Sequence, residues 1–182
     1  MKFTRLRIPD LILFQLHLHQ DPRGYFFESF HQSKFSTFLN QTINFVQDNQ
    51  SFSKKNVLRG LHFQINPHQQ GKLVRVLSGK IFDVAVDLRH ASSTFGQWVG
   101  HILDDVKQEQ LWIPEGFAHG FYAIQDSVVC YKQTAFYSPE HEQSIRWNDS
   151  KLSIDWPLFE QPNVSSKDQT ADLFNNQKIY FK

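Results

Sequence analysis

Two segments of the chain contain histidines whose surroundings suit proton transfer. In the run Val57 to Gln64, His62 lies among small and apolar residues. In the run Pro114 to Gly120, His119 follows a tight turn that Pro and Gly impose. Because the reference pKa of histidine is about 6.5, either imidazole suits general acid–base catalysis near neutral pH. Taken alone, each histidine is more often a residue satisfied by local hydrogen bonds.

Strand alternation divides the first segment between two faces, provided that the strand has no bulge. It places Leu58, Gly60, His62 and Gln64 on one face, and Arg59, Leu61 and Phe63 on the other. Polar His and Gln side chains on a face with small and apolar residues suggest the inside of a barrel.

Lys72 and Tyr131 are further candidates for chemistry. Lys72 alternates with apolar residues, and this spacing favours a solvated face. If Lys72 points inward instead, its ammonium group can stabilise an oxyanion, which is worth about 3–4 kcal/mol. Tyr131 carries a neutral phenol with a reference pKa of about 10 and can act as an acid. Without other information, an ordinary core aromatic is the favoured interpretation of Tyr131.

The two histidine segments resemble the two motifs of the cupin superfamily. Metal-binding cupins carry His-x-His followed by Glu, and then Pro-x-Gly-x-x-His. The second motif is intact here and ends at His119, but Gln64 replaces the second histidine of the first, and no Glu follows at the family spacing. Two imidazoles without the third and the carboxylate make a poor site for a divalent metal, so we expect no metal and no cofactor. A metal-dependent oxygenase is therefore disfavoured.

Short runs rich in Val, Ile, Phe, Tyr and Trp must position these side chains. They are bounded by Gly, Pro, Asn, Asp and Ser, which predicts strands at 45–47, 57–64, 72–76, 81–88, 97–103, 110–113, 119–123 and 128–134. One short helix is expected at 31–40, and the polar last twenty residues have room for another. The pattern predicts an all-β, cupin-type jelly-roll sandwich or barrel with a few short peripheral helices, as a single domain over residues 1–182.

Composition narrows the possible partners and the compartment. The net charge of +1 gives no global attraction to nucleic acid or membrane, so any anion site must be local. Cys130 is the single cysteine and has no partner for a disulfide, which fits a reducing compartment. The first ten residues lack the apolar run of a signal peptide, and no window reaches 18 apolar residues, so we expect a cytoplasmic protein.

Beyond the cupin motifs, the chain resembles the dTDP-4-dehydrorhamnose 3,5-epimerase family over nearly its whole length. The matching blocks keep the family's order and lie at 21–28, 47–49, 58–62, 70–74, 87–89, 93–98, 112–121, 131–132, 137–140, 145–147, 155–157 and 166–168. Asn56 departs from the family, which usually has Gly there, but Asn tolerates a left-handed turn. Gln50 and Phe52 lie in a more variable segment, which leaves the sugar and nucleotide preference open.

The resemblance implies a role for each matching residue. His62 would remove the proton beside the ketone, Asp168 would orient His62, Lys72 would stabilise the enolate oxygen, and Tyr131 would return a proton from the opposite face. His119 would line the sugar pocket, and Arg23 and Arg59 would hold the diphosphate. The other implied substrate contacts are Phe26, Glu28, Gln47, Asn49, Glu142 and Lys167. Phe26, Phe136 and Tyr137 are all candidates for stacking on the nucleobase.

The resemblance also implies a substrate and an assembly. The substrate would be dTDP-4-keto-6-deoxy-D-glucose, epimerised at carbons 3 and 5 to dTDP-4-keto-L-rhamnose for dTDP-L-rhamnose synthesis. The enzyme would be a homodimer in which the N-terminal segment lends Arg23 and Glu28 to the partner's site. Two alternatives stay open. One is an epimerase that acts at carbon 3 or carbon 5 alone, in the pathway of another dTDP-4-keto-deoxysugar, and the other is a cupin that binds a sugar nucleotide without catalysis.

Overall fold

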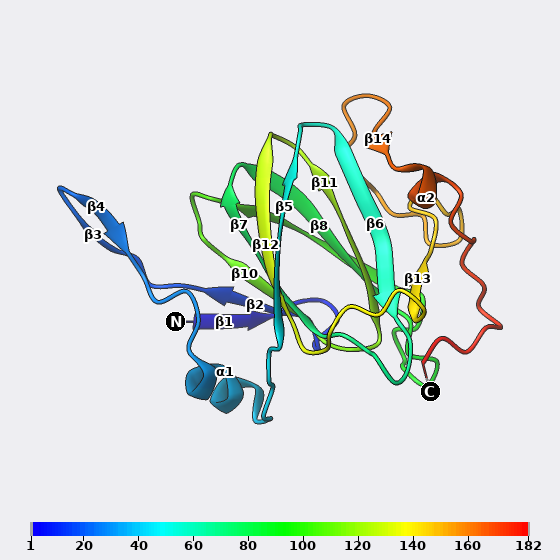
Figure 1. Ribbon diagram of the computed structural model, residues 1–182, viewed down its shortest axis with the longest axis horizontal. Coiled ribbons are helices and arrows are strands. Elements are labelled where there is room, and N and C mark those ends of the chain that lie inside the picture. The colour runs from blue at the N-terminus through cyan, green and yellow to red at the C-terminus, as the bar shows by residue number, and fades with distance from the viewer. Residues whose placement is uncertain (1, 182) are drawn as a thin grey trace.

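The computed structural model describes residues 2–181 and is built almost entirely from strands (Figure 1). The strands are β1 (Lys2–Arg5), β2 (Ile12–Gln15), β3 (His19–Asp21), β4 (Gly24–Phe26), β5 (Gln47–Ser53), β6 (Val57–Gln64), β7 (Lys72–Ser78), β8 (Lys80–Asp87), β9 (Trp98–Asp104), β10 (Gln110–Ile113), β11 (Phe117–Ala123), β12 (Ser127–Gln133), β13 (Glu142–Ser144) and β14 (Asn163–Val164). The helices are α1 (Gln32–Leu39) and α2 (Ser166–Gln169). Neither helix within residues 2–181 is long and apolar enough to cross a bilayer.

Two sheets face each other and form the body of the molecule (Figure 1). Sheet I has the strand order β1-β2-β10-β7-β12-β5, and sheet II has the order β13-β6-β11-β8-β9, with β14 added parallel to β6. A third, two-stranded sheet is the hairpin of β3 and β4, which projects from the body. The arrangement confirms the predicted all-β sandwich of cupin type.

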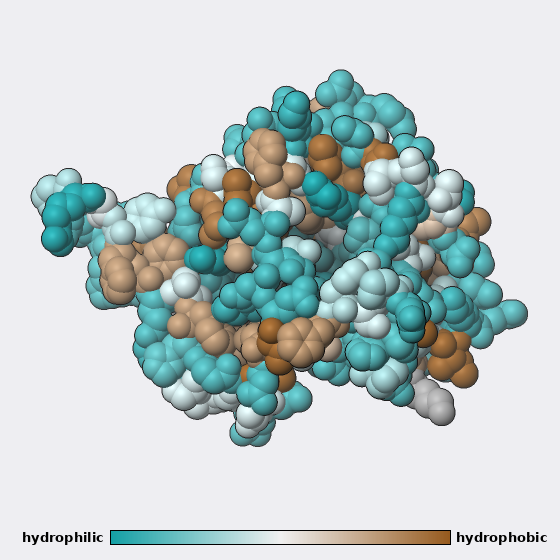
Figure 2. Space-filling view, in the orientation of Figure 1, coloured by the Kyte–Doolittle hydropathy of each residue, from teal (hydrophilic) through white to brown (hydrophobic). Residues whose placement is uncertain are grey.

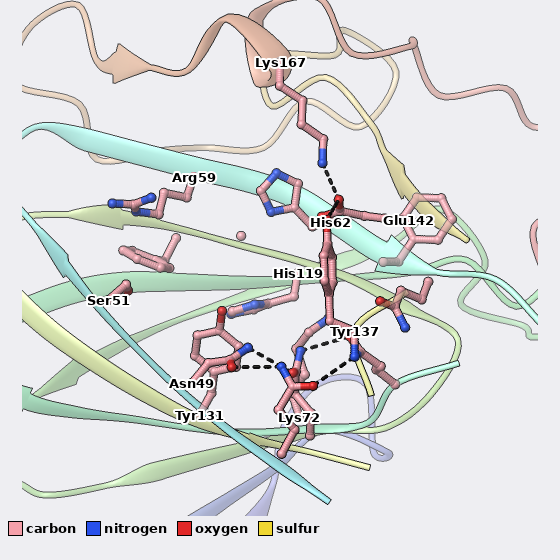
Figure 3. Close-up of a pocket in the computed structure, with 17 residues that line it drawn as sticks. Asn49, Ser51, Arg59, His62, Lys72, His119, Tyr131, Tyr137, Glu142 and Lys167 are labelled. Carbon is pink, nitrogen blue, oxygen red and sulfur yellow. Dashed lines mark hydrogen bonds and ion pairs between the residues drawn. The ribbon is translucent and has the colours of Figure 1, made fainter. Parts of the chain in front are cut away.

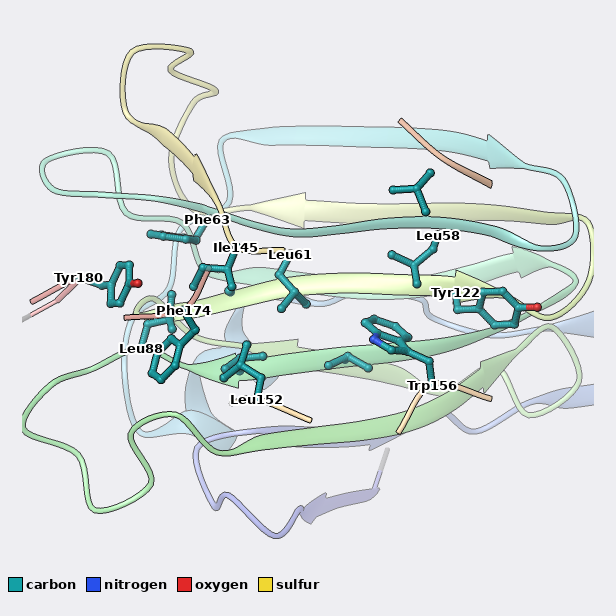
Figure 4. Close-up of a cluster of buried hydrophobic side chains, with 14 of the residues drawn as sticks. Leu58, Leu61, Phe63, Leu88, Tyr122, Ile145, Leu152, Trp156, Phe174 and Tyr180 are labelled. Atoms are coloured by element: carbon teal, nitrogen blue, oxygen red, sulfur yellow. The ribbon is translucent and has the colours of Figure 1, made fainter. Parts of the chain in front are cut away.

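Alternation along the strands creates three apolar layers. The cluster between the sheets includes Val74 and Val129 from sheet I and Ala85 from sheet II. A second cluster covers the outer face of sheet II, where strand residues pack against the C-terminal part of the chain (Figure 4). A third lies on the outer face of sheet I, where Leu73 and Trp112 pack with residues of the α1 region. Burying a Val, Leu, Ile or Phe side chain in these layers stabilises the fold by roughly 1.5–3 kcal/mol.

A bulge in β6 changes the alternation that the sequence predicts. His119 of β11 pairs with His62, but Phe121 pairs with Arg59, so Gly60 and Leu61 together oppose one residue. Gly60 has φ +128°, and a Cβ at this position would lie 2.5 Å from the Cα of Gly120, so only glycine fits.

The bulge corrects the predicted faces of β6. Arg59 lines the cavity with His62 and Gln64, while Leu58 packs in the outer cluster. The prediction that Leu58 shares the face of His62, with Arg59 opposite, was therefore wrong. The prediction that His62 and Gln64 face the inside of the fold is confirmed.

The eight predicted strands all overlap observed strands, and both expected helices are present. The helix expected at 31–40 is α1, and α2 lies in the last twenty residues. The strand expected at 45–47 begins at Gln47 and continues through a polar stretch to Ser53, because β5 is an edge strand whose outer face meets solvent. Asn56 has φ 71°, the left-handed conformation expected of it.

Candidate active site

A cavity of about 460 Å³ opens between the two sheets and is lined by side chains from both (Figure 3). A volume of this size suits a small organic ligand. Sheet I supplies Gln47, Asn49, Ser51, Lys72, Tyr131 and Gln133, and sheet II supplies Arg59, His62, Phe63, Gln64, His119, Gly120, Phe121 and Glu142. Gln70, Tyr137 and Lys167 complete the lining. Side chains from the two sheets would therefore contact a molecule in the cavity from opposite sides.

His62 is paired with Asp168, which lies behind it on α2. The His62 Nε2 to Asp168 Oδ1 distance is 2.6 Å. Asp168 also accepts from the backbone N–H of Gly60 at 3.2 Å, and its own N–H donates to the N-cap side chain of Ser165. Burial acts to raise the pKa of Asp168, but the hydrogen bonds and charge of His62 hold it below its ordinary value. A deprotonated Asp168 accepts the Nε2 proton, which leaves the Nδ1 lone pair of His62 as the basic site.

Lys72 points into the cavity and is only 6% exposed. Burial lowers its pKa to about 8, against the opposing charges of Glu142 and Asp83. The prediction from spacing that Lys72 lies on a solvated face was wrong. Leu73 takes the outward position instead and packs in the apolar layer beneath α1. Lys72 must therefore face inward, where its ammonium group can meet a developing negative charge.

His119 lies directly beside His62 and has a carboxylate partner of its own. The two histidines are paired positions on neighbouring strands. His119 Nε2 lies 2.8 Å from Asp83 Oδ2, and Asp83 is completely buried. Within residues 2–181, no cluster of three or more His, Cys, Asp or Glu side chains has the arrangement of a metal site. Each histidine is hydrogen-bonded to a carboxylate, and such a pair suits proton transfer and polar recognition.

Arg59 places a guanidinium group at the cavity wall. Its Nε donates to Ser53 Oγ at 2.9 Å, and one terminal nitrogen donates to the carbonyl oxygen of Phe52 at 3.1 Å. These contacts hold the planar group while leaving other N–H donors available. A fixed guanidinium of this kind suits phosphate oxygens.

Glu142 joins two other residues at the mouth of the cavity (Figure 3). Its Oε2 accepts a hydrogen bond from Tyr137 Oη at 2.9 Å and another from Lys167 Nζ. Burial acts to raise the pKa of Glu142, but Lys167 and Tyr137 hold it below its ordinary value. The hydrogen bond to Glu142 raises the pKa of Tyr137. Lys167 and Asp168 are consecutive in α2, so this short helix is attached to the site at two points.

Three predicted site residues lie away from the cavity in this chain. Arg23 and Phe26 are on the β3–β4 hairpin, and the Arg23 side chain is 90% exposed and paired with Asp21. Glu28 follows the hairpin and pairs with Lys34 at 2.8 Å. In the space-filling view the hairpin stands clear of the body (Figure 2). Of the three aromatic candidates for a nucleobase contact, Tyr137 alone lines the cavity.

Several cavity residues were not singled out from the sequence. They are Ser51, Phe63, Gln70, Gly120, Phe121 and Gln133. Asp83, the partner of His119, was also missed, although a carboxylate within the apolar alternation of 81–88 was a visible signal. Gln70 and Gln133 gave no such signal, because glutamine is ordinary on strand surfaces and its pairing depends on long-range contacts.

Comparison with known proteins identifies close relatives. A family model described as dTDP-4-dehydrorhamnose 3,5-epimerase matches residues 5–176. The dTDP-4-dehydrorhamnose 3,5-epimerases of Pseudomonas aeruginosa and Salmonella typhimurium are 53% and 51% identical over 175 and 176 residues, covering 96% of both chains in each comparison. The crystal structure of the 3,5-epimerase from Legionella pneumophila, in complex with dTDP-4-keto-L-rhamnose, is 49% identical with a TM-score of 0.92. The match covers 94% of this chain and 92% of the Legionella pneumophila chain.

Proposed function

The chain belongs to the dTDP-4-dehydrorhamnose 3,5-epimerase family, and we propose that it inverts carbons 3 and 5 of its substrate with His62 as base and Tyr131 as acid. As an epimerase of this family it acts on dTDP-4-keto-6-deoxy-D-glucose and forms dTDP-4-keto-L-rhamnose, in dTDP-L-rhamnose synthesis. One observation carries the proposed roles: His62, backed by Asp168, enters the cavity from sheet II, while Tyr131 enters from sheet I (Figure 3).

Inversion requires that a proton leave one face of a carbon and arrive on the other. A carbon beside a ketone is acidic because the carbanion delocalises onto the ketone oxygen. His62 Nδ1 would remove this proton from the side of sheet II, and Asp168 would stabilise the imidazolium that forms. Tyr131 Oη would donate a proton from the side of sheet I. General acid–base catalysis of this kind contributes about 10²–10⁴-fold.

Lys72 and His119 would support the intermediate. The negative charge of the enolate gathers on the ketone oxygen, and a buried ammonium group stabilises it far better than water does. Lys72 is buried on the cavity wall and keeps two carboxylates within electrostatic range. His119 would contact the sugar from its fixed position beside Asp83. The ketone already activates both carbons, so the proposed reaction uses side chains alone.

The nucleotide end of the substrate would lie toward the mouth of the cavity. Arg59 would bind the diphosphate, and Gln47, Asn49, Glu142 and Lys167 would supply further polar contacts. In a neighbouring copy of the chain, the β3–β4 hairpin would bring Arg23, Phe26 and Glu28 to the same mouth. The exposure of Arg23 and of the Phe26 ring, which is 72% exposed, supports this role for a projecting hairpin.

The proposed assembly is thus a homodimer with exchanged N-terminal hairpins, and a mixing experiment tests it. On this proposal, Arg23→Ala and His62→Ala should each inactivate a homodimer. After mixing and subunit exchange, a heterodimer has one site with both native residues, so activity should return. Size-exclusion chromatography with light scattering checks the dimer itself. A monomer, or a mixture that stays inactive despite exchange, would exclude this arrangement. We also propose a cytoplasmic location, which the lone Cys130 supports and which cell fractionation tests.

The decisive test of function uses dTDP-4-keto-6-deoxyglucose in deuterated water, followed by NMR. The proposal predicts deuterium exchange and inversion at both carbon 3 and carbon 5, and loss of both in His62→Ala. Exchange at one carbon would establish a single-centre epimerase instead. Binding without exchange at either carbon would reject catalysis on this substrate and favour a sugar-nucleotide-binding protein.

A further inference from the structure

The segment Ala135–Ser138, which we call the strap, has no regular secondary structure and contributes Tyr137 to the lining of the cavity. Glutamine side chains nevertheless bind its backbone. Gln70 Nε2 donates to the carbonyl oxygen of Ala135 at 2.9 Å, and Gln64 Nε2 donates to that of Phe136 at 3.2 Å. Two glutamines that line the cavity therefore bind two of the strap's carbonyl groups.

Two backbone N–H groups of the strap are also bound by glutamine side chains. The N–H of Tyr137 donates to Gln47 Oε1 at 2.9 Å, and the N–H of Ser138 donates to Gln64 Oε1 at 2.8 Å. Three glutamines thus bind two carbonyl groups and two N–H groups of the strap, which satisfies polar backbone groups that have no strand partner.

The glutamines are connected to one another by a relay of carboxamides. Gln47 Nε2 donates to Asn49 Oδ1 at 2.9 Å, and Asn49 Nδ2 donates to Gln133 Oε1 at 2.9 Å. Gln133 Nε2 then donates to Gln70 Oε1 at 3.0 Å. Since Gln47 and Gln70 both bind the strap, the relay begins and ends on it, and part of it is visible beside Asn49 in Figure 3.

The two ends fix the direction of every hydrogen bond in this relay. It starts at the N–H of Tyr137, which can only donate, and finishes at the carbonyl of Ala135, which can only accept. Reversing one amide would place two oxygens or two N–H groups face to face. Gln70 and Gln133 are 6% and 4% exposed, so water cannot readily replace a lost bond.

The strap carries two aromatic side chains with different surroundings. Tyr137 lines the cavity and its hydroxyl donates to Glu142, whereas Phe136 is 66% exposed and does not line it. We propose that the relay of Gln47, Asn49, Gln133 and Gln70, together with Gln64, positions Tyr137 as a wall of the substrate pocket and so sets substrate affinity. Gln70 and Gln133 are thus positioning residues. The inference rests on the proposed function, in that this pocket takes the sugar nucleotide.

The test compares Gln70→Met with the matched control Gln69→Met. Met keeps the length of the side chain and removes its hydrogen bonds. Gln69 is the adjacent glutamine, lines a different hollow and makes no side-chain hydrogen bond within residues 2–181. Gln70→Met should weaken binding of dTDP alone, measured by calorimetry, and raise KM by about tenfold, because a buried group loses its partner. Its kcat should stay within about threefold, since His62, Lys72 and Tyr131 keep their contacts.

A double-mutant cycle shows whether Gln70 acts through Tyr137. In a Tyr137→Ala background, Gln70→Met should cause no further loss of dTDP affinity, because the positioned ring is already absent. Additive losses in the two backgrounds, or a fall in kcat equal to the change in KM, would overturn the proposal. If Gln70→Met does not fold, as judged by thermal unfolding, Gln133→Met breaks the relay at its other buried member and replaces it in the cycle.

The two proposals fail in different ways. A wild-type protein that neither binds dTDP nor exchanges substrate protons would reject the proposed function. An active wild-type enzyme whose dTDP affinity is unchanged by Gln70→Met would reject the positioning role alone.

Discussion

Asp168 Oδ1 lies 2.6 Å from His62 Nε2, although 106 positions separate the two residues in the chain. The contact forms because α2 packs against β6, and the backbone N–H of Gly60 and the Ser165 cap fix the carboxylate. Asp168 is 3% exposed, so the imidazole orientation is set by a rigid and mostly buried partner. The position of Asp168 therefore determines which nitrogen of His62 is basic.

Asp168→Asn should lower kcat by about 10²–10³-fold, because an amide neither stabilises an imidazolium nor enforces the Nε2–H tautomer. KM should change little, since Asp168 lies behind His62 rather than in the cavity lining. Steady-state kinetics together with deuterium wash-in at carbon 3 and carbon 5 measure the effect. Unaltered wash-in would show that His62 needs no partner.

The same carboxylate gives a signed prediction for stability. Its pKa is lower in the folded protein than the reference value of about 3.9. A carboxylate whose pKa is lowered by folding stabilises the fold at pH values above its pKa in the unfolded chain. This contribution is lost as the pH falls through its pKa in the folded protein. The Tm advantage of wild type over Asp168→Asn should therefore be complete at pH 6 and shrink below about pH 4. An advantage that is constant down to pH 2 would contradict the assignment of a charged Asp168 that accepts the hydrogen bond from His62.

Lys72 should produce an alkaline limb in the pH–rate profile. With a pKa of about 8, it loses its charge as the pH rises through that value, and the stabilisation proposed for the enolate is then lost. We expect kcat/KM to fall with a midpoint near pH 8. Lys72→Met should lower kcat by about 10²–10³-fold. A pH profile that is flat to pH 10 would assign the oxyanion to another group.

Burial of the charged Lys72 lowers the free energy of unfolding, whereas the charged Asp168 raises it. A lysine whose folded pKa is lowered destabilises the fold while the unfolded state is protonated, and the penalty disappears as the pH rises from the folded to the unfolded pKa. The drop from 10.5 to about 8 corresponds to about 3 kcal/mol at neutral pH. Lys72→Met should thus unfold at higher temperature than wild type at pH 7, and the gain should fade by pH 10.5. A lower Tm at pH 7 would contradict this prediction.

Residue patterns predicted the strand content and the two histidine segments because both depend on local sequence. Ile81 to Asp87 alternates regularly, and the strand was found as predicted. The resemblance to a family pointed to Asp168, whose contact with His62 is a property of the folded chain alone. Patterns failed where a long-range contact decides: Lys72 faces inward only because an apolar layer beneath α1 takes Leu73.

The same distinction explains the other errors. Which side chains of β6 face the cavity depends on the close approach of Gly60 to Gly120, and simple alternation cannot predict this contact. The β3–β4 hairpin is short and exposed, so it has no hydrophobic signal, although Pro22 and Gly24 mark its turn. The relay that holds the strap combines residues from separate elements. Its members are polar, and their spacing along the chain carries no period.

Tyr131→Phe should separate proton removal from proton return. His62 would still take a proton and return deuterium from solvent to the same face, so exchange continues without inversion. We expect NMR in deuterated water to show wash-in at a rate within about tenfold of wild type, with product formation reduced by about 10²-fold or more. Equal losses of exchange and inversion would mean that Tyr131 acts in both steps, and full inversion would mean that another acid serves the face of sheet I.

Gly60→Ala tests whether the bulge in β6 is required for the site. A Cβ at Gly60 would lie 2.5 Å from the Cα of Gly120 and 3.0 Å from the carbonyl oxygen of His119, and the backbone has φ +128°. Both backbones must move, so we expect a loss of at least about 2–3 kcal/mol in unfolding free energy.

The damage should also reach binding, because the bulge is what brings Arg59 to the cavity beside His62. Where Gly60→Ala still folds, dTDP affinity should fall with stability. Gly24→Ala is the matched control for stability: Gly24 has φ +129°, but its Cβ would have no neighbour within 4 Å, so the change imposes backbone strain without the clash. Because Gly24 lies in the hairpin proposed to reach the partner's site, chemical denaturation compares the two variants, and dTDP calorimetry compares Gly60→Ala with wild type. A Gly60→Ala protein as stable as the control would show that β6 can lose its bulge. Retained dTDP binding would then show that Arg59 reaches the ligand with or without the bulge.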